Sequence, residues 1–578
     1  MENTGFKRIF PILSWLPVYD RGWLTADAIA GLTVWGLIIP ESMAYAGVAG
    51  LPPQFGLYTL VVSLLLYAIL GTSRHLIVQP TSATAALIAS SVTMVMVTAG
   101  IVANSVDIDP ALYQQYAIAF TLVVGAVFLV AGLARLGFVT QFLSKPVLDG
   151  FVTGLAVFVM VGQLNKLFGV EKPAGNTVEK FFGILRELPE ANWVTFALGA
   201  GALALLVFLP RWNNKIPAGL IVLFGSIAVS SFLDLNANNG VEVVGVLPKG
   251  LPSFGLPSVD WKALPLMIGP AIGVLLVAFS QTLGVEHEYA DKHDYEIEPN
   301  EELNASAVIN LASGLFGGQI AGGSMAPSAV NDGAGGRSQV VSLVAWCAVI
   351  LTLLFLTPLF TNLPETILAA LILHALLHIV ASRKLRATRL LSRSEFTLGL
   401  LTFAGVIFID VLPGMLIGLA SSLLIIIYRS SRPHLSRLGK VPNEVGVYSD
   451  INHHPENESV PGLLILRLNA PIYYANALTV RDKIMDMIKK ADQPVFAVLF
   501  DAAVQDVLDI TSSNMLKSML KRLHNQGILI YFAEVQDATL AFSEKTGLLD
   551  EIGRDNLFFT VDAAVSFIES ELANRHEA

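Results

Sequence analysis

Long apolar runs, separated by short polar stretches, follow one another from about residue 24 to residue 428. A helix that crosses a lipid bilayer needs about 20 mostly apolar residues. We therefore interpret each run as a membrane span, although some runs are short or interrupted. The pattern predicts fourteen spans, near 27–46, 54–71, 80–98, 113–134, 146–165, 193–210, 217–233, 265–285, 303–317, 326–335, 338–360, 364–381, 395–410 and 412–428.

Two of these spans begin around a proline that is flanked by small and hydroxylated residues. Residues 76–90 read LIVQPTSATAALIAS, and residues 320–334 read IAGGSMAPSAVNDGA. The N-terminus of a helix exposes backbone N–H groups and carries a partial positive charge, so it can bind an anion. Interrupted helices in corresponding places of two halves indicate a transporter binding site at the bilayer midplane. Two ordinary helix starts in loops are the alternative.

A weak internal symmetry accompanies these two stretches. Glu41 precedes Pro80 by a distance similar to that by which Gln281 precedes Pro327. Seven spans that are repeated in the opposite orientation form an inverted repeat, which is a common plan among transporters. The pattern therefore predicts two halves of seven spans each.

After Pro433 the pattern becomes that of an ordinary soluble domain. Apolar strands are expected at 462–468, 495–500 and 527–532, and amphipathic helices at 478–490 and 512–525. Alternating strands and helices predict an α/β layer domain. We divide the chain into a membrane domain, residues 1–433, and an α/β domain, residues 434–578. The sequence of the α/β domain has no Gly-rich phosphate loop and no catalytic cluster, so nothing in it suggests an enzyme.

Composition and charge agree with a multi-pass protein of the inner or plasma membrane. The chain of 578 residues is 54% hydrophobic and 14% charged, against about 25% charged residues in a typical soluble protein. Basic residues such as Arg74, Arg135 and Arg211 fall in alternate connections, which places both termini in the cytoplasm. The net charge of −10 does not suggest nucleic-acid binding. Cys347 is the single cysteine, so no disulfide framework or cysteine metal cluster is possible.

Several motifs resemble the SulP family of sulfate permeases and related anion transporters. They are DAIAGLTV at 27–34, IPESMAYAGVAGLPPQFGLYTLVVSLLLYAILGTSRH at 39–75, SKPVLDGFVTG at 144–154, HDYEIEPNEELNASAVINLASGLFGG at 293–318 and GSMAPSAVNDGAG at 323–335. RLNAPIYYANA at 467–477 opens a region that is similar to the STAS domain, which this family carries at its C-terminus. The resemblance covers essentially the whole chain, in order.

This resemblance implies an α-helical membrane domain with fourteen transmembrane segments in a 7+7 inverted repeat, and a cytoplasmic α/β STAS domain. The membrane domain would consist of a core and a gate subdomain that move against each other like an elevator. The anion would lie between the N-termini of the third and tenth helices. Family members are usually homodimers with STAS contacts, and their substrates include sulfate, bicarbonate, chloride, oxalate and dicarboxylates.

The candidate anion site combines hydroxyl and backbone donors that can replace the water around an anion. Its residues are Thr81, Ser82, Ala83, Thr84, Ser324, Met325, Ala326, Pro327 and Ser328, with Tyr45, Met43 and Gln281 beside them. Helix–helix contact is the alternative role for each hydroxyl. Many relatives have Arg where this chain has Pro327. Helix dipoles would therefore supply most of the positive potential.

Glu41 is the candidate proton carrier. It follows Pro40 inside an apolar helix, and an ionisable residue at membrane depth is a functional hypothesis by default. Burial among uncharged neighbours favours the neutral acid, so Glu41 could carry a symported proton. A carboxylate in water at the helix end is the alternative. Gln281 cannot carry a proton or bind sodium strongly, which argues against sodium coupling.

We therefore expect a secondary active transporter that moves an inorganic anion, with sulfate as first choice, together with a proton. The alternatives are a bicarbonate or dicarboxylate transporter, a chloride–anion exchanger, and a membrane sensor or scaffold that signals through the STAS domain. We expect no cofactor and no metal. In the polar run 286–294, His287 and His293 with nearby carboxylates could form a metal site, but a solvated helix end is the favoured interpretation. Asp509 or Thr511 is expected to cap a helix, with phosphorylation there as the alternative.

Overall fold

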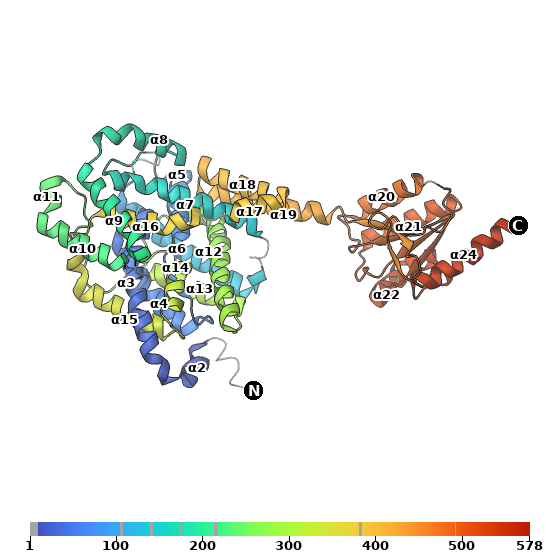
Figure 1. Ribbon diagram of the computed structural model, residues 1–578, viewed down its shortest axis with the longest axis horizontal. Coiled ribbons are helices and arrows are strands. Elements are labelled where there is room, and N and C mark those ends of the chain that lie inside the picture. The colour runs from blue at the N-terminus through green and yellow to red at the C-terminus, as the bar shows by residue number, and fades with distance from the viewer. Residues whose placement is uncertain are drawn as a thin grey trace. The chain divides into compact units, whose positions relative to one another are not determined.

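The computed structural model describes residues 10–103, 108–138, 143–173, 175–212, 218–380, 384–491 and 493–577. The chain forms two compact units, Met1–Ser422 and Leu423–Ala578 (Figure 1). The domain boundary that the sequence predicts between residues 433 and 434 stays a prediction. It divides the chain by function, whereas the two units divide it by contacts.

The first unit is helical, and its helices occupy the predicted spans. In the described residues these helices are α3 (Leu24–Val48), α4 (Pro53–Leu70), α5 (Ser82–Thr98), α6 (Pro110–Leu133), α7 (Lys145–Phe168), α9 (Trp193–Trp212), α10 (Ala218–Leu233), α12 (Leu264–His293), α13 (Pro299–Leu315), α14 (Met325–Gly333), α15 (Val340–Leu351), α16 (Glu365–Val380) and α18 (Arg393–Phe408). A further helix, α19 (Val411–Ser430), begins in the first unit and ends in the second. Eight helical stretches of the described residues are long and apolar enough to cross a membrane, and α5, α10 and α16 are shorter apolar helices.

Short elements connect the spans. They are α2 (Ile12–Trp15), α8 (Thr177–Glu187), α11 (Leu235–Asn239) and α17 (Lys384–Leu391). Two spans differ in detail from the prediction: α12 continues to His293, and α15 changes after Leu351 into π-helical and 3₁₀ turns that end at Phe360. Pro358 lies in the first turn of that 3₁₀ segment, where its missing N–H costs no hydrogen bond.

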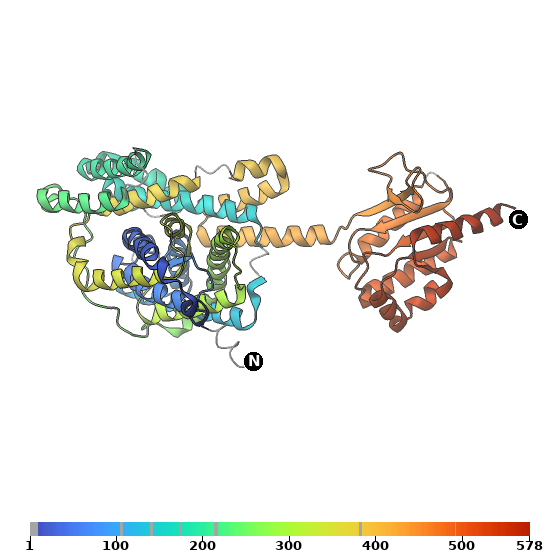
Figure 2. The ribbon, with the colours of Figure 1, turned by 60° about the horizontal axis from the view of Figure 1, so that its bottom comes forward.

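Contacts between helices divide the first unit into two groups. The core group contains α3 to α6 and α12 to α15, and the gate group contains α7, α9, α10, α16 and α18. In Figure 2 the teal, green and amber helices of the gate group form a layer above the blue and yellow-green helices of the core group. Among the described helices, the core group takes four from each half of the chain, which is consistent with an inverted repeat.

Close packing within the core group depends on glycine. A Cβ at Gly56 of α4 would lie 2.0 Å from the Ser42 carbonyl oxygen of α3. Only a residue without a side chain lets the two helices cross at this distance, as is common at helix contacts in membranes. Ser42 follows Glu41 in the chain, so this close crossing restricts the backbone next to Glu41.

The second unit is an α/β domain with a six-stranded sheet of order β4-β3-β5-β6-β7-β8. Its strands are β3 (Leu435–Lys440), β4 (Tyr448–Asp450), β5 (Leu463–Leu468), β6 (Ala497–Asp501), β7 (Leu529–Ala533) and β8 (Leu557–Phe558). The sheet is parallel from β5 to β8, whereas β3 is antiparallel to both β4 and β5.

Helices cover both faces of this sheet. They are α20 (Ala477–Lys489), α21 (Ile510–Asn525), α22 (Asp537–Thr546), α23 (Leu548–Ile552) and α24 (Val561–Glu577). Residues of α20, α21 and α23 form one apolar core with the sheet, and residues of α24 form the other. The three predicted strands and two predicted helices are confirmed. The short strands β3, β4 and β8 are missing from the sequence prediction, because they alternate too little to be recognised.

Candidate anion-binding site

Two short strands inside the first unit carry the starts of α5 and α14. β1 (Ile77–Gln79) pairs antiparallel with β2 (Gly322–Ser324), so that Gln79 lies opposite Gly322 and Ile77 opposite Ser324. Because the strands are antiparallel and each runs straight into its helix, α5 and α14 leave the strand pair in opposite directions. Their N-termini, with their positive dipole ends, therefore point toward each other across the strand pair.

Close approach of the backbone makes this pairing possible. A Cβ at Gly323 would lie 2.9 Å from Leu76 and 3.0 Å from the Thr282 methyl group. The Gly323 N–H donates to the Thr282 hydroxyl at 2.9 Å, which fixes β2 against α12. The strand pair is thus held by the helix that corresponds to α3 in the other half.

Each helix start leaves backbone donors available for an anion. In α5 the Thr81 hydroxyl accepts from the Thr84 N–H, and the Thr84 hydroxyl accepts from the Thr81 N–H, which forms a capping box. No described residue accepts a hydrogen bond from the first N–H groups of the helix, those of Ser82 and Ala83.

In α14 the Ser324 side chain makes no cap hydrogen bond. Met325 and Ala326 are the first residues of the helix and both are exposed. Pro327 is buried in the first turn, where a residue without an N–H leaves the helix intact. The N–H groups of Met325 and Ala326 are therefore the donors that this start can offer.

A buried hydrogen-bond bridge joins the candidate proton carrier to both helix starts. The Gln79 side-chain Nε2 donates to Glu41 Oε2 at 2.8 Å and to Ser324 Oγ at 3.3 Å. Glu41 is 7% exposed and Gln79 is fully buried. The other Gln79 atom, Oε1, is buried without a partner in the described residues. The Gln79 amide, on the strand that leads into α5, thus connects the Glu41 carboxyl group of α3 with Ser324, the N-cap residue of α14.

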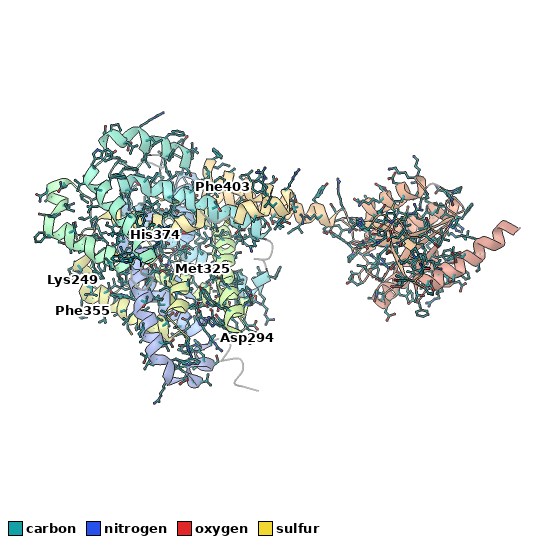
Figure 3. The ribbon with its side chains drawn as sticks, viewed as in Figure 1. Lys249, Asp294, Met325, Phe355, His374 and Phe403 are labelled. Atoms are coloured by element: carbon teal, nitrogen blue, oxygen red, sulfur yellow. The ribbon has the colours of Figure 1, made fainter. Side chains whose placement is uncertain are left out.

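The remaining candidates differ in how they face this centre. Tyr45 is one helical turn beyond Glu41 on the same side of α3, and it is 7% exposed. Met43 has no exposed surface, so it packs into the core. Gln281 is partly exposed on α12. Met325 is 44% exposed although it lies near the centre of the unit in Figure 3, so solvent-accessible space reaches the start of α14.

Two buried polar side chains near the site, Ser328 and Asn331, hold the fold together. The Ser328 hydroxyl donates to the Ser324 carbonyl at 2.7 Å and accepts from the Ile77 N–H at 2.9 Å. Asn331 donates to the His75 carbonyl at 2.9 Å. Ser328 therefore joins β1 to α14, and its proton and one of its two lone pairs are committed to that contact.

Gln79 is the candidate site residue that sequence reasoning misses. Its only signal is a polar side chain in the apolar run directly before Pro80. Its hydrogen-bond partners, Glu41 and Ser324, lie 38 and 245 residues away along the chain. No ion pair of the described residues includes Glu41, and the donors near it are the Gln79 amide and the two helix starts.

Comparisons with known proteins assign both parts of the chain. The profile of the sulfate permease family matches residues 24–402, and that of the STAS domain matches residues 454–564. A probable sulfate transporter of Mycobacterium tuberculosis is 34% identical over 547 residues, covering 95% of this chain and 96% of the relative. Sulfate transporter 1.3 of Arabidopsis thaliana is 30% identical over 595 residues, covering 99% of this chain and 89% of the relative.

Solved structures show the same fold. Murine solute carrier 26 family member A9, an anion transporter in the inward-facing state, superposes with a TM-score of 0.89 at 23% identity, covering 99% of this chain and 95% of that one. The transmembrane domain of a cyanobacterial bicarbonate transporter, BicA, superposes with a TM-score of 0.59 at 20% identity, covering 70% of this chain and 98% of that one. Motifs, fold and comparisons together show that this chain is a multi-pass membrane protein of the sulfate permease family with a C-terminal STAS domain.

Proposed function

We propose that this protein is a proton-coupled symporter of an inorganic anion, with sulfate as the first candidate. The observation that carries the proposal is the bridge from Glu41 through Gln79 to Ser324. It places a buried carboxyl group, with no cation beside it among the described residues, next to the two helix starts that would hold the anion. The relatives named as sulfate transporters support the choice of substrate.

The coupling follows from electrostatics. An ionised Glu41 would repel an anion at the helix starts, whereas a protonated Glu41 would not. At roughly 7 Å and an effective dielectric constant of about 20, two unit charges repel by ~2.4 kcal/mol, which corresponds to about 50-fold in anion affinity. Because linkage is reciprocal, a bound anion favours the protonated acid by the same factor. Proton and anion therefore bind together and are released together.

Gln79 would transmit the change in Glu41 to the anion site. When Glu41 is ionised, its carboxylate holds the Gln79 N–H strongly, because hydrogen bonds to charged groups are about twice as strong as neutral ones. Protonation weakens that bond, and the amide can then turn its donors toward an anion near Ser324. The unpartnered Oε1 of Gln79 is free to accept the proton of the neutral acid in such a rearrangement.

The division of the first unit into core and gate groups supports an elevator-type motion. Glu41, Gln79 and both helix starts all belong to the core group. The complete site can therefore move as one body against the gate group, without changing its own contacts. We further propose that the protein works as a homodimer in which the STAS domains make contacts, with both termini in the cytoplasm.

The test is uptake by the purified protein in liposomes. Labelled sulfate, bicarbonate and fumarate are compared, each with and without an inward proton gradient. We expect gradient-driven accumulation of sulfate that is abolished in Glu41→Gln, while exchange of labelled for unlabelled sulfate continues. Glu288→Gln, which removes an exposed carboxylate of α12, is the matched control and should leave accumulation unchanged.

Other outcomes distinguish the alternatives. Accumulation of bicarbonate or fumarate in place of sulfate would change the substrate but keep the coupling. Flux that responds only to an anion on the opposite side would indicate an exchanger, and would leave Glu41 without a coupling role. A folded protein with no flux of any of the three anions would favour a sensor or scaffold that acts through its STAS domain.

A further inference from the structure

A cluster of two histidines and one aspartate lies at one end of the core group. His75 belongs to the connection between α4 and β1, His293 ends α12, and Asp332 lies in α14. One ligand atom of each residue lies within 4.8 Å of the corresponding atoms of the other two. Figure 3 labels Asp294, the residue after His293, at the lower end of α12. Sequence alone assigns His293 to a solvated helix end, whereas the fold adds His75 and Asp332 from two distant segments.

We propose that His75, His293 and Asp332 bind a divalent transition-metal cation, with Zn²⁺ as the matching probe. Two imidazoles and one carboxylate, with a fourth position left to water, are a donor set typical of zinc. His293 Nε2 and Asp332 Oδ1 are 2.7 Å apart, and the two histidine rings stack with centroids 4.1 Å apart and planes at 15°. Because the stacked rings are nearly parallel, the partly exposed His293 ring would have to turn out of the stack so that one nitrogen of each histidine points at a common cation beside Asp332.

The surroundings orient the ligands as second-shell groups do in metal sites. His75 Nδ1 lies 3.4 Å from the Tyr295 hydroxyl, which in turn lies 2.9 Å from the Ser73 hydroxyl. The rings of Tyr289 and Tyr295 stack on His75 at 6.0 and 5.8 Å. His75 is 4% exposed, so its ring is held in place before any cation arrives.

Lys292 occupies part of the site in its metal-free form. Its Nζ lies 2.5 Å from Asp332 Oδ2, and its side chain is 57% exposed. The ammonium group supplies the positive charge that Asp332 needs, and it can turn into water when a cation takes its place. A metal-free ion-pair cluster accounts for Lys292, His293 and Asp332. The His75 ring takes no part in that ion-pair cluster; it stacks on His293, and its Nδ1 lies 3.4 Å from the Tyr295 hydroxyl.

A bound cation would brace the two halves of the core group. His75 comes from the first half of the chain, and His293 and Asp332 come from the second. Asn331, next to Asp332, already donates to the His75 carbonyl at 2.9 Å, close to where β1 pairs with β2. All three ligands belong to the core group, so binding should raise the stability of that group without connecting it to the gate group.

The experiment measures Zn²⁺ binding to the full-length protein, purified in detergent without a polyhistidine tag and stripped of metal. Zn²⁺ is titrated in competition with a chromogenic chelator, and Co²⁺ absorption reports the ligand geometry. We expect one site, an increase in Tm on adding Zn²⁺, and at least tenfold weaker binding in His75→Ala, His293→Ala and Asp332→Asn. Lys292→Ala should bind Zn²⁺ at least as tightly as the unchanged protein.

Two control variants separate this site from adventitious binding. His287→Ala removes an exposed histidine of α12 outside the cluster. His454→Ala breaks an exposed contact with Glu456 in the second unit. Both should bind Zn²⁺ like the unchanged protein. The proposal is overturned if no saturable site is found, or if His75→Ala binds Zn²⁺ as tightly as His287→Ala. For any variant whose Tm is altered, the Co²⁺ absorption spectrum shows whether the metal is still bound through the same ligands.

Discussion

The starts of α5 and α14 occupy equivalent places in the two halves, but their chemistry differs. At α5, Thr81 and Thr84 use their hydroxyls to cap their own helix. At α14, the Ser324 hydroxyl makes no cap bond and instead receives the Gln79 amide. The first two residues of α14 are exposed, whereas Ala83 of α5 is 2% exposed.

This difference assigns the two starts different tasks. The α5 start is a rigid source of backbone donors and of dipole potential. The α14 start has an exposed surface, and its Ser324 hydroxyl accepts from the Gln79 amide that also binds Glu41; under the proposed function it would be the part that responds to a proton. An inverted repeat repeats the backbone, but each copy can acquire its own side-chain chemistry.

Gln79→Glu is the substitution that should disturb the hydrogen bonds between Glu41, Gln79 and Ser324 most strongly. A second carboxylate would face Glu41, and at 4 Å with an effective dielectric constant of about 20 two such charges repel by ~4 kcal/mol. We expect gradient-driven uptake at pH 7 to fall by about 100-fold or more, with partial recovery at lower pH as the pair takes up a proton. Gln115→Glu, which makes the same change in a partly exposed residue that accepts from the Ser258 N–H, is the control. Equal uptake in both variants would contradict a central role for Gln79.

A fixed cation at α14 should remove part of the dependence on the proton. Pro327→Arg would place a guanidinium in the first turn, beside the exposed Met325 and Ala326. We expect KM for sulfate to fall by about tenfold, equivalent to ~1.4 kcal/mol, and uptake without a proton gradient to increase. Gly333→Arg, at the exposed C-terminal end of the same helix and more than two turns from its start, should leave KM unchanged. If a folded Pro327→Arg protein has the KM of the unchanged protein, the start of α14 does not face the anion.

The two helix starts can be compared directly by removing one hydroxyl from each. Thr81→Ala loses the capping box and should lower the stability of the protein by about 1 kcal/mol, whereas Thr81→Ser should restore it. Ser324→Ala breaks no cap and should leave Tm unchanged, but it should raise KM for sulfate by about 3- to 10-fold, since a single hydrogen bond contributes about 0.5–1.5 kcal/mol. Thermal unfolding and uptake kinetics on both variants test the assignment, and the opposite pattern would reverse it.

A helix start in the STAS domain provides a reference outside the membrane. Asp509 caps α21 by accepting from the Ser512 N–H at 2.7 Å, and it also accepts from the Tyr474 N–H at 2.6 Å. The prediction of a cap is confirmed. Burial acts to raise the pKa of Asp509, but these hydrogen bonds outweigh it and hold the pKa below its usual range.

The sign of the pH effect follows from that lowered pKa. The stabilising effect is complete above the unfolded value of about 3.9 and is lost as the pH falls through the lower folded value. Asp509→Ala should therefore weaken α21 by about 1 kcal/mol near pH 7, and by less in acid. Hydrogen exchange of the α21 amides in the full chain measures this. Asp509→Asn keeps the acceptor and should show no such pH dependence.

The sequence by itself determined the elements of this protein and the places where its chemistry gathers. Apolar runs define the spans, because a bilayer demands helices of a given length. Pro80 and Pro327 mark the two helix starts, and Glu41 stands out as a carboxyl group inside an apolar helix. Strand and helix alternation identifies the α/β domain. Each of these signals lies within one segment of the chain, so it can be recognised without knowledge of the rest of the fold.

Only the tertiary structure decided how these places act on one another. Pairing of β1 with β2 aims the two helix starts at each other and brings Gln79 to Glu41 and Ser324. The same pairing commits Ser328 to Ile77, and the fold brings His75 to His293 and Asp332. Their partners lie far apart in the chain. Residue types and periodicity say which segments form, whereas long-range pairing decides which polar atoms remain free to bind.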